Sequence, residues 1–258
     1  MKMSNENYFA SDGLNFSIIK ELTKSPKHFW DAMENTKQPT KQMTLGTLIH
    51  AAILEPDTFK DLYVAEPGFD KRTKDYKNWL LENEGKIPYD ANELGAIITA
   101  AANAVYSESL NLIFKNQTIN EESFFFKKGN LDLKCKVDAY CPGNQMLIDI
   151  KTSSDISPQK FKHQLFDRLY HLQLCHYIEG LESGGCKVSN ARIVAISTTP
   201  PYDVVEYQLS QEVLERGKEE LYNLYDEVMR VITFNDHDGF CQDVVEVNYP
   251  DYYKSKFI

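Results

Sequence analysis

Three short apolar runs separated by turn-forming residues constrain the fold of this chain more than any other feature. Residues 123–127 and 131–140 flank the turn at 128–130 (Lys-Gly-Asn), a spacing that is typical of two antiparallel strands joined in a hairpin. Residues 141–144 (Cys-Pro-Gly-Asn) form a second turn, and a third apolar run follows at 146–151. The segment therefore predicts three consecutive antiparallel strands.

Helical patterns surround these predicted strands. Apolar residues recur at helical spacing, and Ser25-Pro26 is typical of a helix N-terminus. The expected elements are helices at 26–33, 44–54, 57–64, 73–84, 90–105, 158–166, 169–182 and 211–232, with two further strands at 191–198 and 204–209. The chain is thus predicted to form one α/β domain over 1–258, with a mainly helical part at 1–115 and a core containing the strands at 116–258.

The charge of the chain is distributed unevenly. With 28 basic and 38 acidic side chains the net charge is −10, but residues 201–258 alone carry 13 acidic and 5 basic side chains. Residues 127–192 instead carry 10 basic and 7 acidic side chains. The middle of the chain is therefore compatible with a nucleic-acid site, whereas the acidity is mostly a property of the C-terminal segment.

Membrane and disulfide-linked classes are disfavoured. The longest nearly apolar run, at 94–105, is shorter than the roughly 20 residues that span a bilayer, and the first residues lack the apolar core of a secretory signal. Five cysteines without a Cys-x-x-Cys pair predict reduced thiols rather than a zinc or iron–sulfur site. We therefore expect a cytoplasmic protein with no membrane partner.

The predicted strands also carry the residues with the clearest chemistry. Alternate side chains of an extended strand share a face, so Asp149 and Lys151 point the same way while Ile150 faces the core. The turn at 141–144 folds the strand that bears Asp138 back alongside. Two carboxylates and an ammonium suit phosphodiester hydrolysis with Mg²⁺, because the metal activates water and the lysine stabilises developing negative charge. The same pattern is compatible with a half-exposed strand face that holds a weak ion pair.

Two helical segments add candidate residues. Gln173 and Tyr177 are four residues apart and share a helical face, and His50 lies in the apolar segment 48–52. His50 is able to present a neutral imidazole to a metal, although a lone histidine in such a segment is also typical of a hydrogen-bonded core residue. The corresponding structural alternatives are a solvated Gln173 and a core-edge Tyr177.

These residues, in this order, resemble the RecB-type branch of the PD-(D/E)xK nucleases and, within it, the RecE-type phage recombination exonucleases. The resemblance covers almost the whole chain and rests on Gly46-x-x-x-His50, Leu54-Glu55-Pro56, Asp138, Asp149-Ile150-Lys151 and Gln173-x-x-x-Tyr177, together with 22–30 and 199–202. It implies a restriction-endonuclease-like core, with a central mixed sheet flanked by helices and an N-terminal helical elaboration.

The resemblance also implies a metal site and a catalytic group. His50, Asp138 and Asp149 would bind the metal together with the main-chain carbonyl of Ile150. Lys151 would be the catalytic lysine, and both aspartates would belong to the catalytic set. The expected cofactor is Mg²⁺, with Mn²⁺ as a substitute.

The resemblance leaves the surroundings of this site less defined. Gln173 and Tyr177 would support the site and contact DNA. The family places a further acidic residue on the preceding strand, and both Glu121 and Glu122 are candidates. Relatives often have a Cys-Arg-Pro type sequence before the first aspartate, where this chain has Lys134-Cys135-Lys136-Val137.

The function implied by the resemblance is an exodeoxyribonuclease that hydrolyses linear double-stranded DNA from its ends. It would degrade one strand from 5′ to 3′ and leave 3′ single-stranded overhangs for recombination. The expected partners are double-stranded DNA ends, a single-strand annealing protein and further copies of the chain in a ring, a tetramer by resemblance.

Two alternatives remain open at this point. The first is a Cas4-like nuclease acting on single strands, although the five dispersed cysteines offer no counterpart to the four-cysteine cluster of that group. The second is a non-catalytic DNA-mimic or DNA-binding protein on a nuclease fold, with the acidic segment 201–258 as its partner surface. The presence of all three residues Asp138, Asp149 and Lys151 argues against it.

Other polar residues are expected to have structural roles. His171 and His176 are five residues apart, a spacing that does not place them on one helical face, so we expect each to be structural. A basic patch at 71–77 is typical of a solvated face, with a contact to the phosphate backbone as the alternative.

Overall fold

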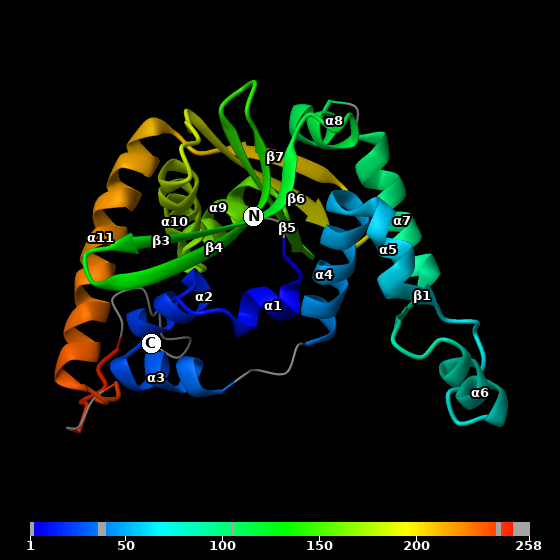
Figure 1. Cartoon of the computed structure of the whole chain (residues 1–258), viewed down its shortest axis with the longest axis horizontal. Coiled ribbons are helices and arrows are strands. Elements are labelled where there is room, and N and C mark those ends of the chain that lie inside the picture. Colours follow the sequence, from blue (N-terminus) through cyan, green and yellow to red (C-terminus); the bar gives the residue numbers. More distant parts are fainter. Residues whose placement is uncertain (1–2, 36–39, 105, 241–243, 250–258) are drawn as a thin grey trace, which may run out of the picture.

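A five-stranded mixed sheet forms the centre of the computed structural model, which describes residues 3–35, 40–104, 106–240 and 244–249 (Figure 1). The strands lie in the order of the sequence, with only the third and fourth parallel. They are β3 (Ile119–Lys128), β4 (Leu131–Cys141), β5 (Met146–Ser153), β6 (Asn190–Ser197) and β7 (Val204–Gln208). The three predicted antiparallel strands are thus confirmed, and the first begins four residues earlier than expected.

The parallel pairing of β5 with β6 requires a crossover, because a tight turn joins only antiparallel neighbours. Two helices supply it, α9 (Pro158–Asp167) and α10 (Tyr170–Ser183), close to the predicted ranges. Helix α10 packs directly on the sheet, where it contacts β3, β4 and β5. Gly180 permits this approach, since a Cβ at that position would overlap the Sγ atom of Cys135 on β4.

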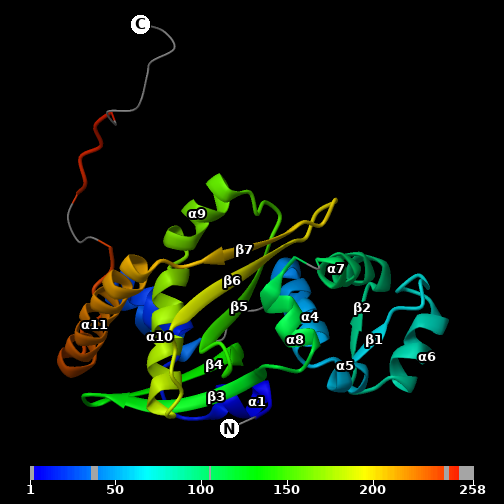
Figure 2. The same ribbon diagram turned by 90° about the horizontal axis from the view of Figure 1, so that it is seen from above.

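Helices cover both faces of the sheet, and Figure 2 shows α10 and α11 on one side and α4, α7 and α8 on the other. Each face of the sheet has its own hydrophobic core, one beneath α10 and α11 and the other beneath α4, α7 and α8. On β6, Ile193 belongs to the first of these cores and Val194 to the second, which is the alternation expected of a strand buried on both faces. Besides α10, the helices that contribute to the first core are α2 (Phe16–Ile19), α3 (Pro26–Glu34) and α11 (Gln211–Phe234). The helices that contribute to the second core are α4 (Lys41–Leu54), α7 (Ala91–Asn103) and α8 (Glu108–Phe114).

Local signals explain most helix boundaries. The Ser25 hydroxyl accepts a hydrogen bond from the His28 N–H, and Pro26 occupies the first turn of α3, as the sequence predicts. The Thr40 hydroxyl caps α4 and the Ser210 hydroxyl caps α11 in the same manner. The ends of these helices therefore follow from residues next to them in the chain.

The prediction of a helix at 57–64 is wrong at its end. Helix α5 spans Pro56–Leu62, and Tyr63–Ala65 forms strand β1, which pairs in parallel with β2 (Ile87–Tyr89). The mainly helical part thus contains a small sheet that the sequence did not predict, because three-residue strands are too short to show a period-two pattern. Helix α6 (Lys74–Glu82) lies between these strands and projects at the lower right of Figure 1. Val105, the predicted end of the helix at 90–105, lies outside the described residues.

Two further expectations concern membranes and cysteines. Within the described ranges, no helix is long and apolar enough to cross a membrane. The four cysteines in those ranges are free, and three of them are buried. Cys241 lies outside the ranges.

The buried imidazole of His176, on α10, connects this helix with α11 and β4. Its Nδ1 atom lies 2.7 Å from the Tyr225 hydroxyl on α11, and its Nε2 atom lies 3.0 Å from the main-chain carbonyl of Lys134 on β4. The carbonyl accepts the Nε2 proton, so the hydroxyl donates to a neutral ring. Burial therefore lowers the pKa of His176 from 6.5 to about 4.

Stability is expected to fall in mild acid because of His176. The unfolded chain takes up a proton near pH 6.5 and the folded chain does so only near pH 4, so this stabilisation is complete above pH 6.5 and is lost as the pH falls. Between pH 7.5 and 5 the wild type should lose about 2 kcal/mol of unfolding free energy that the His176→Gln variant does not lose. Urea unfolding at both pH values measures the difference. Equal losses in the two proteins would contradict the assignment.

Candidate functional site

The two aspartates of the predicted site lie on adjacent strands. Ala139 on β4 pairs with Ile148 on β5, which places Asp138 beside Asp149-Ile150. The main-chain N–H of Ile150 donates a 2.7 Å hydrogen bond to Oδ2 of Asp138. The turn at 141–144 therefore brings the two carboxylates to neighbouring positions of the sheet, as the sequence indicates.

Asp149 is completely buried and is paired with Lys151. The Lys151 Nζ atom lies 2.6 Å from Oδ2 of Asp149, whereas Oδ1 of Asp149 has no hydrogen-bond partner among the residues that the structure describes. Burial and the nearby Asp138 raise the pKa of Asp149 to about 6, although Lys151 opposes the shift. The Lys151 ammonium also lies 4.9 Å from the centre of the Tyr170 ring at the start of α10. This pair is therefore not the half-exposed strand face that the sequence also allows.

His50 reaches the same site from α4. Its Nδ1 atom lies 3.5 Å from Oδ2 of Asp138, although 88 residues separate the two in sequence. Gly46 permits this approach of α4, because a Cβ there would lie only 3.1 Å from the Thr152 hydroxyl on β5. Burial alone would lower the pKa of His50, but the charge of Asp138 raises it overall. In turn, His50 keeps the pKa of Asp138 below its usual value despite burial.

Glu121, and not Glu122, lies with these residues. Lys128 pairs with Leu131 at the hairpin turn, and seven residues further along each strand come Glu121 and Asp138. The Glu121 backbone is in the left-handed region, with φ 56°, which costs a non-glycine residue about 1–2 kcal/mol. Such strain is typical of functional positions. The sequence leaves the choice between the two glutamates open, and the observed register of β3 on β4 decides it.

Three side chains converge closely enough to share a metal ion. One ligand atom each of His50, Glu121 and Asp138 lies within 4.8 Å of the others. One imidazole nitrogen and two carboxylate oxygens suit a divalent cation such as Mg²⁺ or Mn²⁺. The buried Asp149 oxygen without a hydrogen-bond partner, beside this group, also fits a site that receives a cation.

The predicted ligand set overlaps with this group only in part. His50 and Asp138 belong to both, and Glu121 takes the third place in the structure. Asp149 lies next to the group and is paired with Lys151. Ile150 lines the same hollow, and the contact it makes with the group is through its N–H.

Gln173 and Tyr177 lie together on the face of α10 that borders the site. The Gln173 side-chain amide donates a 2.8 Å hydrogen bond to the Tyr177 hydroxyl, and both residues line the hollow. Burial, followed by the charge of Asp149, raises the pKa of Tyr177 well above its ordinary value. Tyr177 is thus a neutral hydroxyl beside the carboxylates.

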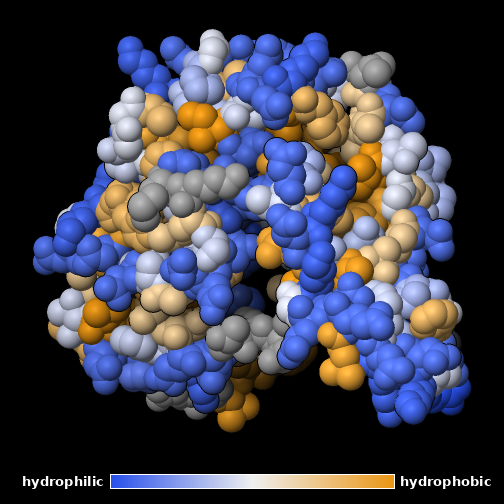
Figure 3. All heavy atoms as spheres, turned by 45° about the vertical axis from the view of Figure 1, so that its right-hand side comes forward, coloured by the Kyte–Doolittle hydropathy of each residue, from blue (hydrophilic) through white to orange (hydrophobic). Residues whose placement is uncertain are grey.

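One large hollow of about 950 Å³ is lined by His50, Glu121, Asp138, Lys151, Gln173 and Tyr177. It extends from α1 (Asn5–Ala10) and α4 to the ends of β5 and β6, and it includes Arg168 and Thr199. Figure 3 shows one face of the molecule, on which hydrophilic side chains predominate and the surface is hollowed near its centre.

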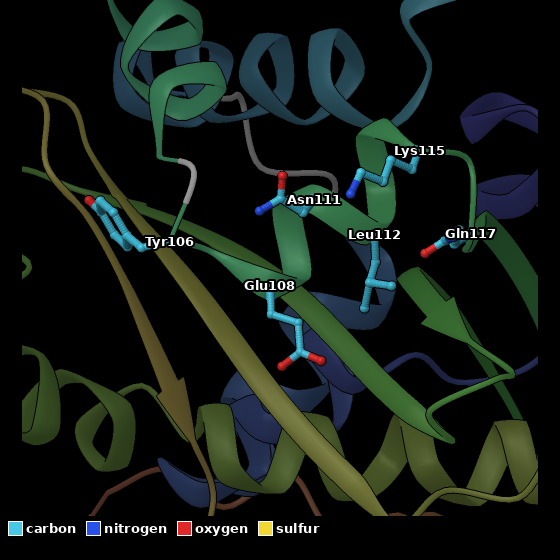
Figure 4. Close-up of a pocket in the computed structure, with 6 residues that line it drawn as sticks. All are labelled: Tyr106, Glu108, Asn111, Leu112, Lys115 and Gln117. Carbon is cyan, nitrogen blue, oxygen red and sulfur yellow. The ribbon is translucent and has the colours of Figure 1, made fainter.

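A second, smaller hollow of about 490 Å³ lies over α8 (Figure 4). It is lined by Tyr106, Glu108, Asn111, Leu112, Lys115 and Gln117. Glu108 is already paired with Arg192 at 2.7 Å, and the three converging side chains, His50, Glu121 and Asp138, line the larger hollow instead. We therefore place the functional site in the larger hollow.

The remaining polar candidates have partners in the structure. His171 lies 3.4 Å from Glu220, and both His171 and His176 are buried, consistent with structural roles. In the basic patch, Lys71 is paired with Glu66, and Arg72 with Asp70, at 2.7 and 2.9 Å. These pairs are exposed, and they agree with a solvated face.

Comparisons with known proteins identify the family and the fold of this chain. The model of a family described as "PDDEXK-like domain of unknown function" (DUF3799) matches residues 15–245. Among solved structures, a "putative exonuclease" from Eubacterium rectale matches with a TM-score of 0.67 and 13% identity over 97% of each chain, which confirms the restriction-endonuclease-like fold. A phage-related exonuclease from Haemophilus somnus 129PT has a TM-score of 0.35 and 14% identity, over 88% of this chain and 100% of that one. No curated protein sequence matches the chain.

Proposed function

This chain belongs to the family of PDDEXK-like domains, and from that premise we propose that it is a divalent-metal-dependent exodeoxyribonuclease. One observation carries the proposal: His50, Glu121 and Asp138 converge beside the buried Asp149–Lys151 pair. A structure of the same fold, from Eubacterium rectale, is described as a "putative exonuclease", which supports action at DNA ends.

The side chains of the site divide the chemical work. His50, Glu121 and Asp138 would hold a divalent cation, with Asp149 and the Ile150 carbonyl as further candidate ligands. When bound, such a cation lowers the pKa of water and offsets negative charge on the phosphate. The Ile150 N–H holds Asp138 in place through its hydrogen bond.

Lys151 would act on the reacting phosphate. Its ammonium is held by Asp149 at 2.6 Å and by the face of the Tyr170 ring. These contacts fix the ammonium beside the side chains that would hold the cation. Burial alone would lower the pKa of Lys151, but Asp149 raises it overall, so the side chain remains charged. A fixed positive charge in a buried site stabilises the charge that develops on phosphate oxygens.

The substrate and direction follow from the resemblance to RecE-type enzymes. We propose linear double-stranded DNA as the substrate, Mg²⁺ as the cofactor, degradation from 5′ to 3′, and 3′ overhangs as the product. A single-strand annealing protein would receive the overhang. A ring of several copies, a tetramer by resemblance, would place the basic middle of the sequence toward DNA and the acidic C-terminal segment outward.

Cleavage of end-labelled DNA tests this function. Purified protein with Mg²⁺ is expected to release nucleotides from a linear duplex and to leave the same DNA intact as a covalently closed circle. Label on the 5′ end of one strand should be released first if the direction is 5′ to 3′. A single-stranded substrate cleaved faster than the duplex would favour the Cas4-like alternative. No cleavage of any substrate would contradict the nuclease function.

A further inference from the structure

A second lysine lies at the site, and the expected catalytic roles do not use it. Lys136 is on β4, two residues before Asp138, and it lines the same hollow. Its Nζ atom lies 2.6 Å from Oε2 of Glu121, and the two side chains are only 11% and 13% exposed. The same ammonium donates a 2.7 Å hydrogen bond to the Asn5 side-chain oxygen at the start of α1.

The three acidic residues of the site each have a different basic side chain as a neighbour. Lys151 lies on Asp149, His50 lies beside Asp138, and Lys136 lies on Glu121. A carboxylate in a buried position requires such a neighbour, because removing a charge from water without compensation is costly. Lys136 therefore supplies the charge that Glu121 needs while no metal is bound.

Glu121 is also one of the three residues that can share a cation. A carboxylate that is paired with an ammonium binds a divalent cation less strongly, because the ammonium already occupies its oxygen. The positive charges of the Lys136 ammonium and of a cation bound to Glu121 would also repel each other. We propose that Lys136 is an internal counter-ion that holds Glu121 in the metal-free protein and yields it to a divalent cation, so that it weakens metal binding and acts as a positioning residue. The inference rests on the proposed function only in assuming that the group binds a divalent metal.

Asn5 makes the exchange feasible. When the Lys136 ammonium leaves Glu121, the Asn5 oxygen remains as a hydrogen-bond acceptor within reach. The ammonium is therefore not left without a partner in a largely buried position, which would oppose its release.

Calorimetric titration of the DNA-free protein with MnCl₂ tests the proposal. Lys136→Gln removes one positive charge beside the cation and is expected to tighten Mn²⁺ binding roughly tenfold. Lys136→Arg keeps the charge and should bind Mn²⁺ with nearly the wild-type affinity. Lys127→Gln is the matched control, because Lys127 lies on the same hairpin but pairs with the exposed Asp132. This control should leave the affinity unchanged.

A second variant predicts the opposite shift. Asn5 is exposed, so Asn5→Ala should fold, and loss of the alternative acceptor should weaken Mn²⁺ binding roughly threefold. Thermal unfolding establishes that each variant is folded. Unchanged or weaker Mn²⁺ binding by folded Lys136→Gln, or tighter binding by Asn5→Ala, would overturn the proposal, as would a wild type that binds no Mn²⁺.

The titration and the cleavage assay separate the two hypotheses. A wild type that binds Mn²⁺ and cleaves no DNA contradicts the nuclease function but leaves the role of Lys136 to the titration. A wild type that cleaves DNA while Lys136→Gln binds Mn²⁺ no more tightly contradicts only the counter-ion role.

Discussion

Replacement of Lys151 by alanine is expected to lower the rate of DNA cleavage about 10²- to 10³-fold, which is the usual cost of removing one fixed group that stabilises transition-state charge. The Lys151 ammonium lies 2.6 Å from Asp149. Lys151 is not one of the three residues that could share the cation, which are His50, Glu121 and Asp138. Mn²⁺ binding should therefore survive the substitution. Single-turnover cleavage of a linear duplex at saturating metal measures the effect.

The Lys151 prediction has a matched control on the neighbouring hairpin. Lys127→Ala removes the same charge from an exposed position and should cleave DNA at the wild-type rate. Lys151→Ala also leaves Asp149 buried without its partner, so the variant should lose stability in the absence of metal. Thermal unfolding identifies that loss separately. A folded Lys151→Ala protein with more than about a tenth of the wild-type rate would contradict the catalytic role.

Asp138→Asn is expected to abolish both metal binding and cleavage. The substitution removes a charge that lies 3.5 Å from His50 and within the converging group, while the amide oxygen can still accept the hydrogen bond from the Ile150 N–H. The fold should therefore be retained. We expect at least about a 10²-fold loss of Mn²⁺ affinity, since even residues behind the ligands cost 10- to 100-fold. Calorimetry and the cleavage assay measure the two losses.

A control on the same strand isolates the site effect of Asp138. Asp132→Asn makes the same chemical change on β4, at a position paired with Lys127 at the far end of the hairpin, and should leave metal affinity and cleavage unchanged. Asp138→Asn that binds Mn²⁺ as tightly as the wild type would show that Asp138 is not a ligand. Metal binding without cleavage would place Asp138 in catalysis alone.

The part of the fold that could be predicted from the sequence is the part with local signals. Strands β3, β4 and β5 follow from apolar runs and the two turns between them, and α3 follows from Ser25-Pro26. The neighbourhood of Asp138 and Asp149 was predictable for the same reason, because one tight turn joins their strands. Strands β1 and β2 were missed because their pairing partners lie more than twenty residues apart and each strand is too short to show a pattern.

The choice between Glu121 and Glu122 depended on strand register. The register is set by the pairing of Lys128 with Leu131, one residue beyond the predicted end of the first strand, so the predicted turn did not settle it. The positive φ at Glu121 is a tertiary feature that no residue preference predicts. The pairing of Glu121 with Lys136 likewise needed coordinates, since opposite charges on neighbouring strands are common without contact. The presence of Glu121 distinguishes the observed group from the predicted ligand set.

The amino-acid sequence by itself determined strands β3, β4 and β5, the turns between them and the kinds of side chain that they carry, because each depends on residues a few positions apart. Only the tertiary structure decided that His50 reaches Asp138 across 88 residues and that Asp149 is completely buried. Both outcomes depend on how closely helices approach the sheet, which the space at Gly46 and Gly180 permits. Burial and the charges brought beside each group together set its pKa, because the cost of ionisation depends on the surrounding medium and on nearby charges.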